Sequence, residues 1–222
     1  MKYGILIQGR ASNWIKDIVL EYNSNFPEAE IVFSTWHGEN VDNIECKIVQ
    51  SELPRAPPDA IFVDRQNINY QIVGVQNGLK KMNADIILKT RSDTFVHNEN
   101  IFDIYNKNCS DEKIMAPDVG TFDFEYRISD FCAVATKKKL DEYWKDIELY
   151  DCKYAVAPET YLTKNYIQKI KKDFRPWKEI LREYFYIRDF HIDFQIEYEK
   201  LSSSGLADEY QRMIYARSIN LG

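Results

Sequence analysis

The first 36 residues contain the pattern that most restricts the fold, two apolar runs of strand length separated by an amphipathic helix. Residues 3–7 form a short apolar run typical of a buried parallel strand, and residues 30–35 form a second one. Between them, Ser12 or Asn13 can cap a helix. Its apolar stripe consists of Ile15, Ile18, Val19 and Tyr22. Such a unit normally makes a right-handed crossover between parallel strands, so we expect an α/β fold.

The alternation of strands and helices continues along the chain. A loop with Pro54, Pro57 and Pro58 precedes a helix that Asn67 can cap. Pro158 suits the first position of a later helix. A last helix of about ten residues is expected after the serine-rich segment 201–205. The further elements that we expect are strands at 46–50, 85–90, 113–116 and 130–136 and helices at 67–82, 137–149 and from about 176.

Length, charge and cysteine content exclude several classes of protein. A chain of 222 residues buries one substantial core, so we expect one domain. The net charge of -6 argues against a general nucleic-acid binder. No apolar run approaches the roughly 18 residues of a membrane span, and the N-terminus does not read as a secretory signal. The four cysteines form no CxxC pair, which favours reduced thiols in a cytoplasmic protein.

Charged residues follow the expected strand 85–90 directly. Arg91 and Asp93 lie just past its C-terminal end, the edge at which open α/β sheets bind ligands. A carboxylate there can ligate Mg²⁺ or Mn²⁺ while the metal bridges a diphosphate, although Asp93 also suits a turn or a cap. The planar fork of Arg91 can contact a diphosphate itself or pair with a neighbouring acid.

Six segments, in their order and spacing, resemble the WavE-type lipopolysaccharide synthesis family, a branch of the GT-A nucleotide-diphospho-sugar transferases. They are residues 5–10, 31–36, 67–73, 89–93, 128–131 and 158–162. The resemblance implies a GT-A-like, Rossmann-type mixed and mostly parallel sheet flanked by helices, with a helical C-terminal part. On this basis we expect a nucleotide-binding half at 1–95, an acceptor half at 96–175 and a helical C-terminal extension at 176–222.

The resemblance also implies which residues meet the nucleotide-sugar donor. The loop after the first strand places Gln8, Gly9 and Arg10 against the nucleotide, and Gly9 permits close approach of the backbone. Gln8 and Arg10 are otherwise ordinary loop residues. Thr35 and Trp36, at the end of the second strand, are further candidate contacts by the same edge rule.

The metal site and the catalytic base are less sharply defined by the sequence. GT-A enzymes typically carry Asp-x-Asp, whereas Arg91 stands here in the place of the first acid, so only Asp93 carries over as a candidate ligand of Mn²⁺ or Mg²⁺. His191 is a candidate second ligand, with a structural role as its alternative. An inverting transfer needs a carboxylate base, for which Asp130 and Glu159 are the candidates. Glu159 also suits a helix N-terminus for reasons of the dipole alone.

The resulting hypothesis is a glycosyltransferase that moves a sugar from a nucleotide-sugar donor to a bacterial surface glycan, in lipopolysaccharide or capsule. A nucleotidyl- or phosphotransferase of the same pathway and a non-catalytic carbohydrate-binding subunit are the alternatives. Basic and aromatic residues interleave between Lys164 and Arg188. This pattern suits a peripheral contact with the inner membrane, an acceptor glycan, or a solvated basic face over an aromatic core.

Overall fold

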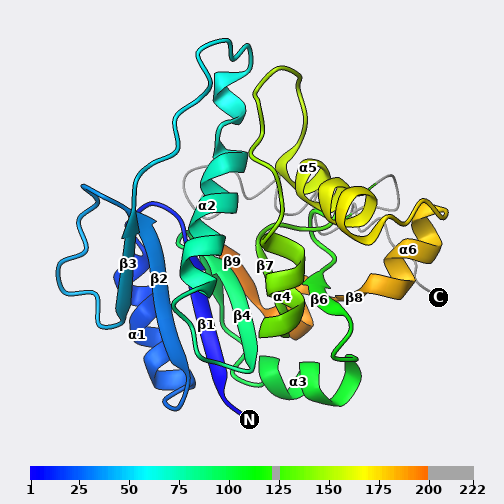
Figure 1. The fold of residues 1–222 in the computed structure, drawn as a ribbon. Helices are drawn as coiled ribbons and strands as arrows, with labels where there is room; N and C mark the ends of the chain where they lie inside the picture. Colours follow the sequence, from blue (N-terminus) through cyan, green and yellow to red (C-terminus); the bar gives the residue numbers. More distant parts are fainter. Residues whose placement is uncertain (122–125, 200–222) are drawn as a thin grey trace.

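The computed structural model describes residues 1–121 and 126–199. Its main feature is a seven-stranded mixed sheet with the order β3-β2-β1-β4-β7-β6-β8, drawn in Figure 1. Its strands are β1 (Tyr3–Gln8), β2 (Glu30–Trp36), β3 (Lys47–Ser51), β4 (Ile86–Arg91), β6 (Ile114–Pro117), β7 (Cys132–Thr136) and β8 (Phe185–Arg188). The expected mixed, mostly parallel α/β sheet is therefore confirmed.

The first four strands are all parallel to one another, as the crossover pattern predicts. Their carboxyl ends consequently meet at one edge of the sheet. Helix α1 (Ile15–Asn25) connects β1 to β2, and α2 (Asn67–Leu79) precedes β4. Neither Ser12 nor Asn67 caps its helix: Trp14 and Gln66 hold the N-cap positions, and neither makes a side-chain capping bond.

Strand β7 runs antiparallel to β4, with Thr90 opposite Cys132. An antiparallel strand begins where its neighbour ends, so the segment just before β7 reaches the edge at which β4 finishes. This reversal in strand direction places residues 129–131 beside the end of β4. It is the feature of the topology that joins the two halves of the chain at one site.

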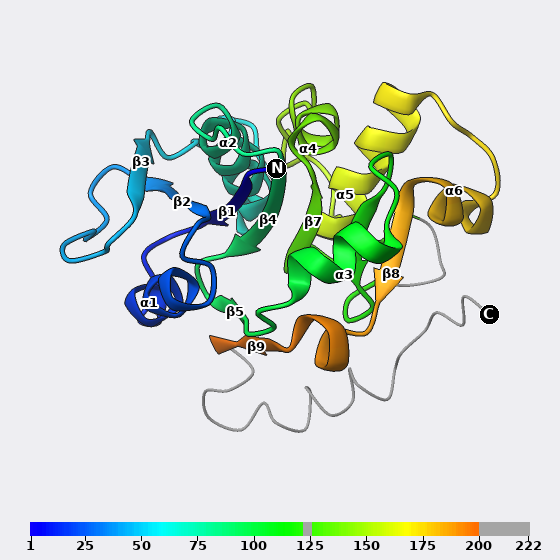
Figure 2. The ribbon, with the colours of Figure 1, turned by 90° about the horizontal axis from the view of Figure 1, so that it is seen from below.

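Helices and a small second sheet cover the two faces of the main sheet, as Figure 2 shows. One face packs against α2, α4 (Lys137–Trp144), α5 (Pro158–Lys164), the π-helical segment η2 (Asn165–Lys171) and α6 (Trp177–Tyr184). The other face packs against α1, α3 (Ile101–Asn108), the segment η3 (Phe190–Phe194) and a two-stranded sheet of β5 (Thr94–Val96) and β9 (Ile196–Tyr198). A single-turn 3₁₀ helix, η1 (Val63–Arg65), precedes α2. No helix among the described residues is both long and apolar enough to cross a membrane.

The C-terminal part is less helical than the sequence predicts. Helix α6 begins at Trp177, close to the expected start, but the chain then enters the main sheet as β8 and the small sheet as β9. Both strands lie where a continuing helix is expected, and both pair with strands that are distant in sequence. The helix expected after residues 201–205 lies outside the described residues.

Part of the interleaved basic and aromatic stretch packs into the core, whereas Phe174 within it is 73% exposed. Tyr166 and Phe185 are buried. Three cations of the stretch are paired with carboxylates on the surface. These pairs are Lys169 with Glu148, Lys171 with Glu142, and Arg175 with Asp173.

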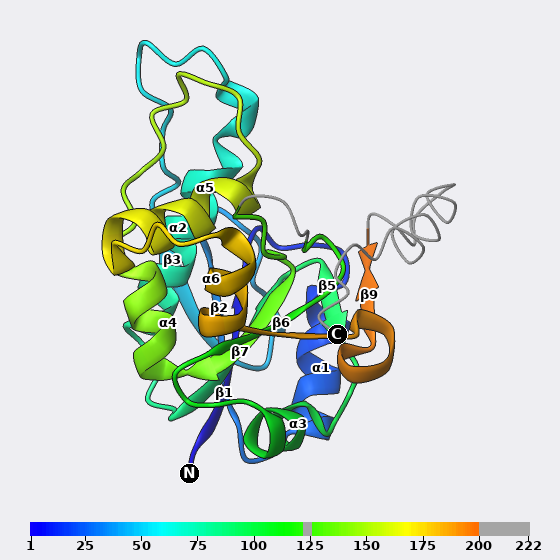
Figure 3. The same cartoon turned by 90° about the vertical axis from the view of Figure 1, so that its right-hand side faces the viewer.

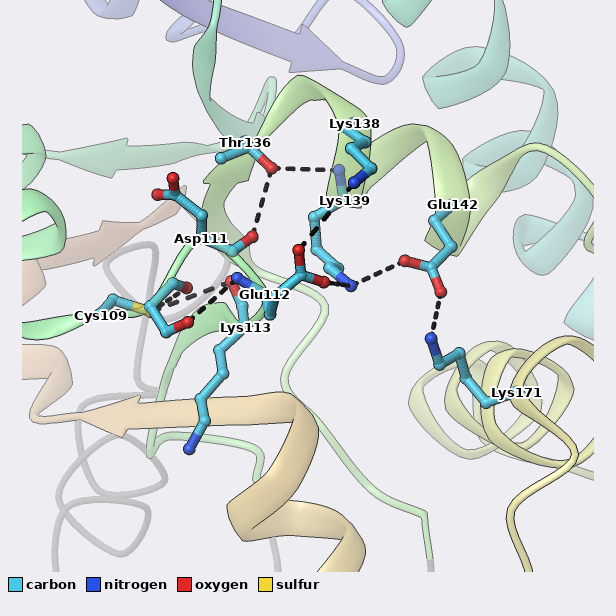
Figure 4. Close-up of polar contacts among 10 residues, drawn as sticks. Cys109, Asp111, Glu112, Lys113, Thr136, Lys138, Lys139, Glu142 and Lys171 are labelled. Carbon is cyan, nitrogen blue, oxygen red and sulfur yellow. Dashed lines mark hydrogen bonds and ion pairs between the residues drawn. The ribbon is translucent and has the colours of Figure 1, made fainter.

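An ion-pair network fixes α4 against its neighbours (Figure 4). The side chain of Lys139 is only 4% exposed and contacts Glu112 at 3.0 Å and Glu142 at 2.7 Å. Glu142 also pairs with Lys171 of η2 at 2.5 Å. Burial lowers the pKa of Lys139, but its hydrogen bonds to the two glutamates outweigh this and raise it. Because each carboxylate has a lysine partner, we interpret this network as structural.

Two long segments project beyond the sheet at its carboxyl edge and lie side by side (Figures 1 and 3). One precedes α2 and the other connects α4 to α5. The backbone amides of Ile61 and Phe62 donate to the carbonyl of Cys152, which joins them.

Candidate active site

A cleft of about 250 Å³ lies at the carboxyl edge of β1, β2 and β4. Six of the seven residues expected to meet the donor line it, and Thr35 does not. Thr35 is fully buried, so the expectation that it contacts a ligand is not supported by the structure. The lining comprises Gln8, Gly9, Arg10, Ser12, Trp36, Asn67, Tyr70, Gln71, Arg91, Ser92, Asp93 and Glu199.

Gly9 allows the chain to leave β1 and turn into the floor of the cleft. Its φ angle of 143° lies in a region that side chains rarely adopt. A Cβ atom at this position would lie 2.4 Å from the Oγ of Ser92. The amide of Gly9 donates to the carbonyl of Ser34, and the amide of Ser92 donates to that of Gln8. These bonds hold the ends of β1, β2 and β4 together.

Three cleft residues carry buried polar atoms that have no hydrogen-bond partner among the described residues. They are Oε1 of Gln8, Nε1 of Trp36 and Oε1 of Gln71. Each of these residues is at most 6% exposed. Buried polar groups are almost always paired, so these three atoms are candidates for contact with a ligand or a water molecule.

The side of the cleft formed by α2 is shaped by a glycine and an aromatic ring. A Cβ atom on Gly74 would lie 2.9 Å from Cγ of Gln8 and 3.6 Å from the ring of Trp36, so the glycine makes room for both. The Tyr70 ring lies 5.7 Å from that of Trp36, and the guanidinium of Arg10 lies 6.0 Å from the Tyr70 ring. Rings arranged in this way suit the stacking of a planar group.

Arg91 and Asp93 form a bidentate ion pair at the end of β4. Nε and Nη2 of Arg91 donate to the two carboxylate oxygens of Asp93 at 2.9 and 2.8 Å. The guanidinium lies beside two aromatic rings, 5.6 Å from the centre of the Phe131 ring and 5.1 Å from that of Tyr198. Burial lowers the pKa of Arg91, but the charges of Asp130 and Asp93 outweigh this and raise it. The pairing of Arg91 with a neighbouring acid is therefore the arrangement present in this structure.

Asp130 reaches the same cluster from the segment before β7. Its side chain is 8% exposed, and one of its oxygens lies 3.6 Å from Nη1 of Arg91. Nε2 of Gln71 donates to its other oxygen at 2.6 Å. The buried Lys89 ammonium donates to the backbone carbonyl of Asp130 at 2.8 Å. Burial lowers the pKa of Lys89 to about 8, against the opposing effect of Asp130.

Glu159 stands in the first turn of α5. It lines a small cavity of about 30 Å³ together with Asp130, Lys89 and Tyr143. Burial and, next, the charge of Asp130 raise the pKa of Glu159, while Arg127 and Arg91 act in the opposite direction. The two candidate bases are thus neighbours in different environments, and such a difference is typical of acid–base sites.

The candidate metal ligands do not come together. His191 lies in η3, beyond the pairing of β9 with β5 that places Tyr198 opposite Thr94. The chain therefore leads His191 away from Asp93, and its backbone amide donates to Asp189. Among residues 1–121 and 126–199 no group of three or more His, Cys, Asp or Glu could hold a metal. In this structure both carboxylate oxygens of Asp93 accept hydrogen bonds from Arg91.

Several residues of the site were not identified from the sequence. Gln71 lies one turn after Asn67, near the start of the helix that begins at the carboxyl edge of the sheet, and this position is the signal that could have revealed it. Lys89 stands in an apolar strand, where a charged side chain is unusual. Glu199, in the cleft lining, and Tyr198, whose hydroxyl accepts from Nη2 of Arg91, reach the site only through the pairing of β9 with β5, which no local pattern reveals.

The family model described as WavE lipopolysaccharide synthesis matches residues 11–214 of this chain. The chain belongs to the WavE family. The resemblance of the six segments is thereby confirmed, although the family description names neither the donor nor the acceptor of this member. A comparison with curated proteins finds no match.

Solved structures share the fold of this WavE protein at low sequence identity. A mannosyltransferase from Pyrobaculum calidifontis, in complex with GDP-Man and Mn²⁺, is 8% identical with a TM-score of 0.50. The match covers 85% of this chain and 55% of the mannosyltransferase chain, and it shows a shared GT-A-like fold. A glycosyltransferase involved in glycosylation of the major capsid of PBCV-1 is 12% identical over 97% of this chain and 100% of its own, with a TM-score of 0.48. HddC from Yersinia pseudotuberculosis is 10% identical over 96% and 98%, also with a TM-score of 0.48.

Proposed function

We propose that this WavE protein is a glycosyltransferase that binds a nucleotide-sugar donor in the cleft of Gln8, Trp36 and Arg91. The observation that carries the proposal is the set of three unpaired, buried polar atoms that line the cleft at the carboxyl edge of the sheet. The shared fold and the family description support the proposal. The acceptor is a bacterial surface glycan, of the lipopolysaccharide class by the family description or of the capsule class.

In this proposal the base and ribose of the nucleotide lie against the ends of β1 and β2. Tyr70 offers a ring face, and the polar atoms of Gln8 and Trp36 offer an acceptor and a donor. Gly9 lets the backbone approach the ligand closely. The diphosphate then lies over the end of β4, near Arg91.

Charge compensation in this proposal comes from guanidinium groups. The side chain of Arg91 is 26% exposed and that of Arg10 is 60% exposed, so both are accessible from the cleft. A diphosphate competes with Asp93 for the fork of Arg91, because guanidinium binds phosphate and carboxylate with the same geometry. The cluster therefore predicts donor binding without added Mn²⁺ or Mg²⁺.

The acceptor side of the site is formed by Asp130 and Glu159. In an inverting transfer one carboxylate removes the proton from the acceptor hydroxyl as the sugar bond forms. Asp130 is oriented by Gln71 and lies beside Arg91, which places it next to the diphosphate region. We propose Asp130 as the base and Glu159 as its neighbour on the acceptor side. We propose a cytoplasmic location, with a peripheral contact on the inner membrane as the finer form of this proposal.

A thermal-shift screen with UDP, GDP, CMP and dTDP, each with and without Mn²⁺, tests the donor proposal. A nucleotide that binds only the native state raises the apparent stability by about 2.7 kcal/mol at a concentration of 100 times its Kd. We expect one nucleotide class to raise the Tm, with the same shift in both metal conditions. No shift with any nucleotide would support the alternative of a non-catalytic carbohydrate-binding subunit, and a shift only with Mn²⁺ would contradict compensation by arginine.

A further inference from the structure

A groove outside the cleft lies between α5–η2 and the segment that connects α4 to α5. Its volume is about 400 Å³, within the range of small-molecule sites. Its lining includes Glu148, Tyr154, Thr160, Tyr161, Asn165 and Gln168. None of these residues lines the nucleotide cleft or the cavity below Asp130.

The charges that line this groove balance. Lys169 pairs with Glu148 at 2.5 Å, and the ammonium of Lys164 lies 5.8 Å from the centre of the Tyr126 ring. Asp151 supplies the remaining charge, so the groove has two lysines and two acids. A balanced lining of this kind favours a neutral polar ligand over a phosphate or an anionic headgroup.

The uncharged side chains of the groove include an aromatic ring and a side-chain amide, which are suited to a polyhydroxylated ring. Tyr154 is 50% exposed, and its ring is held edge-on against that of Tyr150 at 5.5 Å. Asn165 is 6% exposed; its Nδ2 donates to the carbonyl of Tyr161, while its Oδ1 has no partner among the described residues. A ring face beside amide acceptors suits a sugar, which has apolar C–H faces and hydroxyl donors around its edge.

The groove is also continuous in sequence with the proposed active site. Glu159 lines the cavity beneath Asp130, and the next residue, Thr160, lines the groove. We propose that the groove binds a neutral sugar residue of the acceptor glycan, next to the one that receives the transferred sugar. The acceptor role rests on the proposed function, whereas binding of a sugar in the groove does not.

Saturation-transfer NMR with the full chain and the methyl glycosides of glucose, galactose and N-acetylglucosamine tests the proposal. We expect at least one glycoside to receive saturation from the wild-type protein. In Tyr154→Ala the signal should fall by about two- to twelvefold, since an aromatic contact of this kind contributes about 0.5–1.5 kcal/mol. Phe174→Ala is the matched control, because Phe174 is 73% exposed and lies outside the groove lining, and it should keep the signal.

Two results would overturn the groove proposal. One is the absence of saturation transfer from all three glycosides to folded wild-type protein. The other is a signal that Tyr154→Ala leaves intact, which would place the sugar elsewhere. The nucleotide screen is independent of both, so a failure of the donor proposal is distinguishable from a failure of the groove proposal.

Discussion

The two sides of the candidate active site are built in different ways. The side formed by the ends of β1 and β2 carries neutral polar atoms without partners, in Gln8 and Trp36. The side formed by β4, β7 and α5 carries buried charges that nearly all have partners, with Arg91 at their centre. The side at β1 and β2 can therefore bind a ligand without losing existing contacts. The side at β4, β7 and α5 must exchange existing contacts when a ligand binds.

Replacing Arg91 tests the charged side and has the largest expected effect. Arg91→Met leaves the carboxylates of Asp93 and Asp130 without their shared guanidinium. Breaking a buried ion pair lowers the free energy of unfolding by about 3–5 kcal/mol. Because this pair is partly exposed, we expect a loss of about 3 kcal/mol. Nucleotide binding should be lost as well. Chemical denaturation and the nucleotide screen measure these two effects.

Arg175→Met is the control for the charged side. Arg175 binds Asp173 with a similar fork, but its side chain is 46% exposed and lies outside the cleft. Asp173 is 10% exposed but keeps the hydrogen bond from the Tyr184 hydroxyl, so the loss of stability should be smaller than in Arg91→Met, about 1 kcal/mol, and nucleotide binding unchanged. Equal effects of the two substitutions would contradict a special role for the Arg91 cluster.

Gly9→Ala tests the backbone turn that joins the two sides. A side chain at a φ of 143° costs about 1–3 kcal/mol, and its Cβ would displace Ser92. We expect a loss of about 2 kcal/mol in stability and of about tenfold or more in nucleotide affinity. Gly38→Ala is the control, since Gly38 also has a positive φ, of 87°, but has open space around it and lies outside the cleft. A comparable loss of affinity in Gly38→Ala would show that the Gly9 effect is a general loss of stability.

Trp36→Phe tests the neutral side by removing one unpaired donor. The variant loses ring volume but also loses a buried N–H without a partner, and such a group costs about 1–3 kcal/mol, so the net stability should change little. Nucleotide affinity should fall about tenfold, which calorimetric titration measures. Trp177→Phe removes the same volume at a buried site on α6 and should leave affinity unchanged. Unchanged affinity in Trp36→Phe would show that the indole N–H makes no contact with the nucleotide.

Glu159→Gln tests the environment of the carboxylate pair and has the smallest expected effect. The pKa of Glu159 is raised in the folded state, so its ionised form is disfavoured there relative to the unfolded chain. The stability that Glu159 contributes is therefore complete below its ordinary pKa and is lost as the pH rises through its raised pKa. The variant should have the higher Tm at pH 8 and a similar Tm at pH 4. A gain of equal size at both values would exclude the ionisation as its cause.

The nucleotide side of the site can be predicted from the sequence, because the residues that form it directly follow predicted strands. Gln8, Trp36 and Asp93 each follow a strand that the apolar pattern identifies, and parallel strands bring their ends to one edge. The strand pattern alone does not predict that Asp130 lies in the site, because only the antiparallel direction of β7 brings it to that edge. The family resemblance supplies this prediction. Tyr198 was missed since its strand pairs with one about 100 residues earlier. Thr35 was placed in the site because the edge rule does not say which side of a strand faces the ligand.

In the proposed site nucleotide binding and proton transfer are carried by different residues, and Asp130→Asn tests this separation most directly. Asparagine keeps the shape of Asp130 and can still accept from Gln71, but it cannot act as a base. Nucleotide affinity and sugar transfer would both be measured, with the donor found in the nucleotide screen. We expect affinity within about threefold of the wild type and transfer reduced by about 10²–10⁴-fold. Transfer at the wild-type rate in a folded Asp130→Asn protein would contradict the account.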